Sequence, residues 1–136
     1  GLEYVVEDGY SKRPVMLHRV VFGSIERFIG ILTEHFAGAF PIWLAPVQVV
    51  VLPIADRHID YAQDVSEKLE KEGIRAEIDQ KSESVNRKIR NAEIQKIPYM
   101  LIVGDKEIEA KKVAVRKYEV GDQGQMDLKE VIKAIE

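Results

Sequence analysis

An arginine stands where the local electrostatics disfavour a cation. Ser24 is typical of a helix N-cap, because apolar residues recur at helical spacing after it: Ile25, Phe28, Ile29, Leu32 and Phe36. Arg27 then lies in the first helical turn, where the helix dipole costs a cation a few tenths of a kcal/mol. Free N–H groups at a helix N-terminus bind anions, so an arginine there, shortly after Gly23, favours a phosphate or a nucleobase stacked on the guanidinium. A salt bridge to Glu26 or another nearby carboxylate explains the placement equally well.

Other side chains capable of catalysis form no recognisable pattern. The histidines His18, His35 and His58 show no metal-ligand spacing among themselves, and a lone histidine in an apolar strand is more often structural. We find no P-loop, no GxGxxG and no signature of a Ser-His-Asp triad. Cysteine is absent, which excludes disulfides and thiolate metal sites.

Positive charge is concentrated in one segment. Residues 81–117 contain ten Lys/Arg and five Asp/Glu, a net charge of +5 in a chain whose total is −3, so the remainder carries −8. A basic segment inside an acidic chain favours a polyanionic partner. A solvated face with uneven charge is the competing explanation.

The composition is that of a globular protein. The 136 residues are 46% hydrophobic and 32% charged, with both signs mixed. No apolar run approaches the roughly 18 residues of a membrane helix. No secretory leader is visible and residue 1 is glycine, so we expect a cytoplasmic fragment of a longer protein, with neither a membrane nor DNA as its partner.

The elements that must position these residues fall into two parts. Two strands around an Asp8-Gly9 turn and one helix are too few to bury a core alone, so the first 40 residues must pack on something outside this chain. Alternating strands and helices follow, which predicts a three-layer α/β/α domain with a mostly parallel, mixed sheet of about five strands over 41–136. The expected strands are 2–6, 14–22, 47–53, 74–78, 99–104 and 112–120; the expected helices are 24–35, 56–72 capped by Asp56 and closed by Gly73, 85–96, and 128–135.

The stretch RPVMLHRVVFGSIERFIGILTEHFAGAFPIWLAPVQV resembles the threonyl-tRNA synthetase family. A strand, Gly23, and then Glu26-Arg27 opening a helix match motif 3 of class II aminoacyl-tRNA synthetases. The α/β module after it resembles the class IIa anticodon-binding domain. His18 within RPVMLHR, together with GDKEIEAKKVAVR further on, favours the threonine enzymes. The resemblance implies that 1–40 is the end of a catalytic domain and 41–136 an anticodon-binding domain.

The resemblance also implies roles and partners for the parent enzyme, which joins threonine to tRNA(Thr) using ATP with Mg²⁺. Arg27 and Ser24 match positions at the ATP, and His18 matches the third ligand of a zinc ion whose other protein ligands lie upstream. The parent is expected to be a homodimer in the cytoplasm, and this chain alone to hold no cofactor. The anticodon positions are Arg90, Glu107 and Arg116; the expected phosphate contacts are Lys81, Lys88, Lys111 and Lys112.

Two other functions remain open at this point. A non-catalytic RNA-binding or accessory protein could use the same module. A generic α/β domain that binds small molecules is the weaker option, because it leaves the basic segment and the position of Arg27 unexplained.

We predict that the isolated chain does not retain zinc, because His18 supplies one ligand where a catalytic zinc needs three from the protein. Metal analysis after dialysis checks this. Stoichiometric zinc that is lost in His18→Ala would contradict it.

Overall fold

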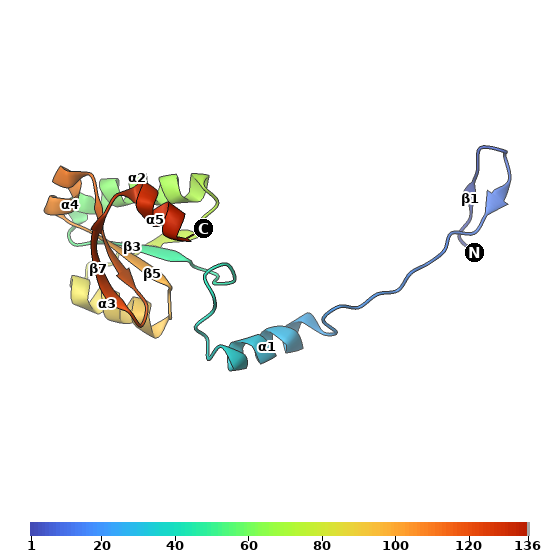
Figure 1. Ribbon diagram of the computed structural model, residues 1–136, viewed down its shortest axis with the longest axis horizontal. Coiled ribbons are helices and arrows are strands. Elements are labelled where there is room, and N and C mark those ends of the chain that lie inside the picture. Colours follow the sequence, from blue (N-terminus) through green and yellow to red (C-terminus); the bar gives the residue numbers. More distant parts are fainter. Residues whose placement is uncertain (136) are drawn as a thin grey trace. The chain divides into compact units, whose positions relative to one another are not determined.

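The computed structural model describes residues 1–135, which divide into two compact units, Gly1–Ile31 and the chain from Leu32 onward (Figure 1). Helix α1 (Ile25–His35) crosses the point of division. The domain boundary expected after residue 40 stays a prediction.

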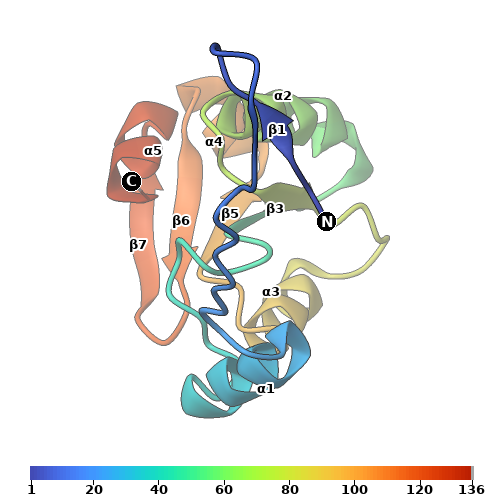
Figure 2. The same cartoon turned by 90° about the vertical axis from the view of Figure 1, so that its right-hand side faces the viewer.

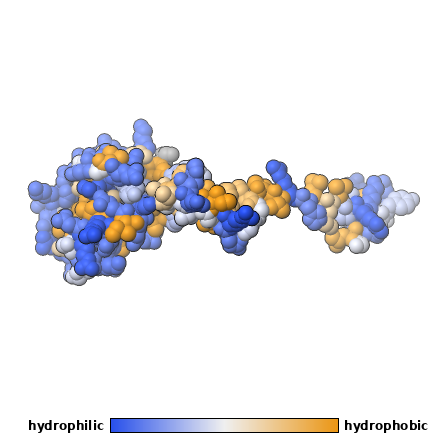
Figure 3. Space-filling view, turned by 90° about the horizontal axis from the view of Figure 1, so that it is seen from below, coloured by the Kyte–Doolittle hydropathy of each residue, from blue (hydrophilic) through white to orange (hydrophobic). Residues whose placement is uncertain are grey.

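The first unit contains a small hairpin and a long segment without regular structure. Strand β1 (Tyr4–Val5) pairs antiparallel with β2 (Ser11–Lys12) around the expected turn. The predicted strand over 14–22 is wrong, because a strand needs a neighbour for its hydrogen bonds and 11–12 take that place beside β1. Its apolar side chains are therefore exposed, Leu17 at 88% and Val15 at 87%, and apolar surface is plain on this unit in Figure 3.

Ser24 begins α1 as its spacing predicts. The backbone N–H of Arg27 donates to Ser24 Oγ at 3.4 Å, and that of Phe28 donates to the Ser24 carbonyl at 3.0 Å. The hydroxyl also donates to Glu26 at 2.7 Å and lowers the pKa of that carboxyl.

The second unit is built on a mixed five-stranded sheet of order β4-β3-β5-β6-β7. Strand β3 pairs in parallel with β4 and with β5, whereas β5–β6 and β6–β7 are antiparallel. The strands are β3 (Val49–Pro53), β4 (Ala76–Ile78), β5 (Tyr99–Val103), β6 (Val113–Lys117) and β7 (Gly121–Met126).

Helices cover both faces of this sheet, so the three-layer prediction is confirmed (Figure 2). Residues of β3, β5 and β6 that point to one face share a core with α2 (Ile59–Lys71) and α5 (Leu128–Ile135), for example Val51, Val115 and Val131. The opposite face of β3 and β5 packs on α3 (Val85–Ile94), where Leu52 and Met100 meet Ala92.

Three details differ from the sequence prediction. Asp56 does not cap a helix; it begins a short 3₁₀ helix, η1 (Asp56–His58), and the N–H of Ala55 is accepted by His58 Nδ1 instead. The strand expected over 112–120 ends at Lys117 and is followed by β7, which was not foreseen. Helix α4 (Asp105–Ala110) was not foreseen either.

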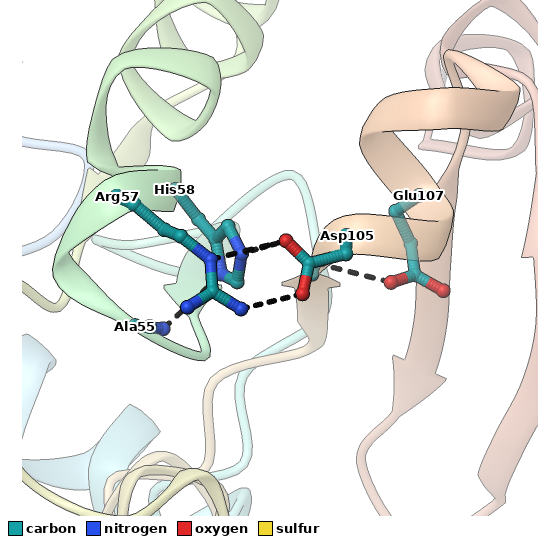
Figure 4. Close-up of polar contacts among 6 residues, drawn as sticks. Ala55, Arg57, His58, Asp105 and Glu107 are labelled. Atoms are coloured by element: carbon teal, nitrogen blue, oxygen red, sulfur yellow. Dashed lines mark hydrogen bonds and ion pairs between the residues drawn. The ribbon is translucent and has the colours of Figure 1, made fainter.

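Loops after the parallel strands β3 and β5 meet at one edge of the sheet, where α/β proteins often bind ligands. Here side chains fill that position (Figure 4). Arg57 donates two hydrogen bonds to the Asp105 carboxylate, at 3.1 and 2.5 Å, and His58 Nε2 lies 2.9 Å from Asp105 Oδ1. Because His58 Nδ1 already accepts an N–H, Nε2 carries the ring proton and donates it to Asp105.

Lys88 is buried, which is unusual for a lysine. Only 4% of the residue is exposed, and Nζ donates to the carbonyls of Pro53 at 3.0 Å and Asp79 at 2.9 Å. The ammonium therefore links α3 to the carbonyl at the end of β3 and to the carbonyl directly after β4.

Lys88→Met should destabilise the chain by about 1–3 kcal/mol, because two carbonyls lose their donor while the aliphatic packing is kept. Urea unfolding measures this. Lys81→Met, at an exposed lysine, is the matched control and should change the free energy of unfolding by less than about 0.5 kcal/mol. Equal effects of the two variants would contradict the structural role of Lys88.

Asp105 should stabilise the chain in a pH-dependent way. The Arg57 guanidinium, with the His58 N–H, holds the pKa of the Asp105 carboxyl well below its ordinary value. The stabilisation that Asp105 provides is therefore fully present above the unfolded-state pKa of about 4, and it is lost as the pH falls below that value. Asp105→Asn should lower the urea midpoint at pH 7 and flatten its decline below pH 4, whereas Asp64→Asn, on the exposed side of α2, should keep the wild-type slope.

Candidate nucleic-acid interface

One strip of the sheet is covered by no helix of residues 1–135. Along β6, Val113 and Val115 point into the core with α2 and α5, so Ala114 and Arg116 point to the face of α3. Ala114 pairs with Ile102 of β5 on one side and with Gln125 of β7 on the other. All four residues that face this side are at least partly exposed, which leaves an accessible strip with a small apolar floor. They are Ile102, Ala114, Arg116 and Gln125.

Arg116 lies at one end of this strip. Its Nε and Nη2 both donate to Glu93 Oε1 of α3, at 3.2 and 3.1 Å. The arginine side chain is 33% exposed and that of Glu93 is 40% exposed. The pair is thus partly open to solvent, and the guanidinium keeps one edge free of Glu93.

Glu107 lies toward the other end. Its Oε2 accepts the N–H of Gly104 at 3.0 Å, which caps α4, and its Oε1 accepts a hydrogen bond from Gln125 Nε2 at 2.6 Å. The residue is 8% exposed, whereas Gln125 is exposed. The carboxylate therefore borders the strip beside Gln125.

Arg90 is exposed on α3, on the same side of the sheet. With Ile94 and Tyr118 it lines an open hollow of about 410 Å³, which Glu93 also borders. An aliphatic, an aromatic and a guanidinium group together suit a flat, unstacked base.

The four lysines expected at phosphates are not brought together. Lys81 is exposed in the loop before α3, and Lys112 is partly buried before β6. Lys111 lines a groove of about 570 Å³ with α2 and α5, on the other face of the sheet. Lys88 is the clear correction, because its ammonium is enclosed by backbone carbonyls and cannot meet a phosphate.

The remaining candidates lie in the N-terminal unit. Arg27 is exposed in the first turn of α1, directly after the cap made by Ser24, and His18 is exposed in the segment without regular structure. Among residues 1–135 no three His, Cys, Asp or Glu side chains cluster as metal ligands. Within the same residues, no helix has both the length and the apolarity to cross a bilayer.

Sequence reasoning missed Glu93, Gln125 and Ile102 as parts of this site. Glu93 carries no signal beyond its charge, and Gln125 lies in a strand that the sequence did not reveal. Their contacts follow from the register of β5, β6 and β7, which only the structure supplies.

The chain is similar to curated threonine–tRNA ligases along its whole length. It is 62% identical to the enzyme of Desulforamulus reducens over 100% of this chain and 59% identical to that of Carboxydothermus hydrogenoformans over 98%. In both cases it spans 21% of the relative's length.

Solved structures show the same relationship. The RNA binding domain of threonyl-tRNA synthetase from Cryptosporidium parvum matches with a TM-score of 0.78 and 32% identity, covering 98% of this chain and 34% of that one. A prolyl-tRNA synthetase from the same organism matches with a TM-score of 0.64 and 25% identity, over 70% of this chain and 21% of that one. The anticodon binding domain model matches residues 48–136, and the chain therefore belongs to the anticodon-binding domain family.

Proposed function

We propose that this chain is part of a threonine–tRNA ligase, which activates L-threonine with ATP and transfers it to tRNA(Thr), and that its sheet reads the anticodon. The observation that carries the proposal is the uncovered strip of β6 and β7, which has Arg116 at one end and Glu107 toward the other. The identity to threonine–tRNA ligases along the whole chain supports the same enzyme.

A guanine fits the chemistry of this strip, and guanine is the central base of threonine anticodons. An arginine fork donates to O6 and N7, and a carboxylate accepts from N1–H and N2–H₂. Ile102 and Ala114 between them offer an apolar surface for the face of the base. Arg116 and Glu107 supply one recognition edge each.

Other contacts would add affinity or read a neighbouring base. Arg90, with Tyr118 and Ile94 beside it, suits a second splayed base. Lys81 and Lys112 would neutralise phosphates without reading sequence. Lys111 would meet RNA only where the RNA reaches the face of α2 and α5.

The catalytic roles rest on the resemblance alone. Arg27, exposed at a helix N-terminus beside Ser24, has the charge and position to meet the phosphates of ATP with its Mg²⁺. A bound zinc ion would polarise threonine's polar groups, with His18 as one ligand beside ligands from elsewhere in the parent. The parent would act as a homodimer in the cytoplasm. The alternative of a non-catalytic RNA-binding protein is not favoured, since the similar curated proteins are ligases.

The decisive test uses an RNA hairpin with a threonine anticodon and a copy whose central guanine is adenine. The chain should bind the first about 10- to 100-fold more tightly, since adenine lacks both donors for the carboxylate and has an amino group in place of the O6 acceptor. Arg116→Lys keeps the charge but loses the fork, so it should reduce this ratio to what the Glu107 edge alone provides. Fluorescence anisotropy at fixed salt measures it.

Arg87→Lys is the matched control, because Arg87 of α3 also pairs with a glutamate, Glu83 of the loop before that helix, at 3.4 Å. It should change the affinity for both hairpins about equally. A wild-type chain that binds the two hairpins equally would contradict the proposed function.

A further inference from the structure

Resting on the proposed function, we propose that Glu93 and Gln125 are positioning residues that hold Arg116 and Glu107 so that together they accept a guanine and no other base. Neither residue belongs to the expected anticodon set. Each makes a side-chain contact with one of the two expected readers.

Glu93 fixes which edge of Arg116 is offered. Nε and Nη2 both donate to the same oxygen, Oε1, so the side edge of the guanidinium is occupied. The N–H groups of Nη1 and the second one of Nη2 point away from Glu93, because the guanidinium is planar. Of these three N–H groups, one on Nη1 and one on Nη2 form a parallel pair, which matches the O6 and N7 acceptors of guanine.

Gln125 restrains the carboxylate of Glu107. One carboxylate oxygen accepts the N–H of Gly104 and the other accepts Gln125 Nε2, so rotation of the carboxylate is restrained from both sides. Each oxygen keeps a further lone pair. Two acceptors therefore remain for the N1–H and N2–H₂ donors of guanine.

The residues that lead to the two ends lie on one face of the sheet. Gln125 pairs with Ala114, and Arg116 follows two residues later on the same face of β6, about 7 Å along the strand, just past a bulge in the pairing of β6 with β7. Only guanine presents an acceptor pair and a donor pair on its two edges. Adenine keeps the N7 acceptor, but its 6-amino group would face one arginine donor, and without N1–H and the 2-amino group it would leave the carboxylate without its two donors.

Stability alone does not explain these contacts. An ion pair between side chains that are 33% and 40% exposed adds little to folding. A negative charge on an RNA-binding face also opposes the phosphates, so Glu93 lowers affinity for RNA in general. Preorganisation of Arg116 gives a reason for its presence, because a long side chain that is already ordered loses less entropy on binding.

The test varies single atoms of the RNA. Hairpins carry guanine, 7-deazaguanine, which lacks N7, or inosine, which lacks the 2-amino group, at the central position. Glu93→Gln should weaken binding of the guanine hairpin about three- to tenfold and shrink the penalty for 7-deazaguanine, while leaving the penalty for inosine unchanged. Gln125→Ala should instead shrink the penalty for inosine and leave the penalty for 7-deazaguanine unchanged. The adenine hairpin should bind Glu93→Gln as tightly as wild type or more tightly.

Controls separate this account from a structural role and from failure of the proposed function. Glu67→Gln removes an acidic group on α2, and Gln123→Ala changes an exposed glutamine on β7; both should keep the wild-type penalties. Melting temperatures of all variants should match that of wild type within a few degrees. The positioning roles are overturned if Glu93→Gln and Gln125→Ala keep the wild-type penalties for both analogues. They are also overturned if these variants lose both penalties and their melting temperature falls. A wild type that does not distinguish guanine from adenine overturns the proposed function instead, and wild-type discrimination without either analogue penalty overturns only this inference.

Discussion

The short connection between β5 and β6 decides which part of the sheet stays uncovered. Nine residues, 104–112, join the two strands, whereas a parallel crossover needs a dozen or more. Strand β6 therefore returns antiparallel, and β7 follows it as a hairpin. In the part of the chain that the structure describes, no helix covers these two strands on the side of α3. The parallel strands β3 and β5 are covered on both faces, while β6 and β7 are covered on one. The polar chemistry of the domain gathers on the face left open.

The connection between β5 and β6 also carries two carboxylates that make different contacts. Asp105 opens α4 and turns to Arg57 and His58, which fills the edge where parallel strands end. Glu107 is two residues further along, caps the helix through Gly104 and faces Gln125. The edge of the sheet that many α/β proteins use for small ligands is thus closed by an ion pair, and recognition is moved to the antiparallel strands. This arrangement argues for a flat ligand lying on a sheet rather than a compact one held at strand ends.

Much of this fold could be predicted from sequence, because its core elements are strongly patterned. The β-branched run of β3 and the periodic apolar residues of α2 bury as expected. Elements whose cause is tertiary were missed: β7 is polar with two glycines and forms because β6 lies beside it, and residues 14–22 have no partner within the described part of the chain. Lys88 was assigned to the surface because lysine usually lies there, and only the meeting of two loops reveals its carbonyl partners. Arg116 and Glu107 were named from resemblance, but what connects them is the register that places Gln125, the partner of Glu107, beside Ala114 on β6.

RNA that lies on the open strip of β6 and β7 should perturb the backbone there. Backbone amide shifts of the ¹⁵N-labelled chain, titrated with the threonine anticodon hairpin, measure this. The largest changes should fall at Ala114, Arg116 and Gln125, with the exposed residues of α2 and α5 unmoved. Changes centred on α2 and α5, with β6 and β7 silent, would contradict this placement of the RNA.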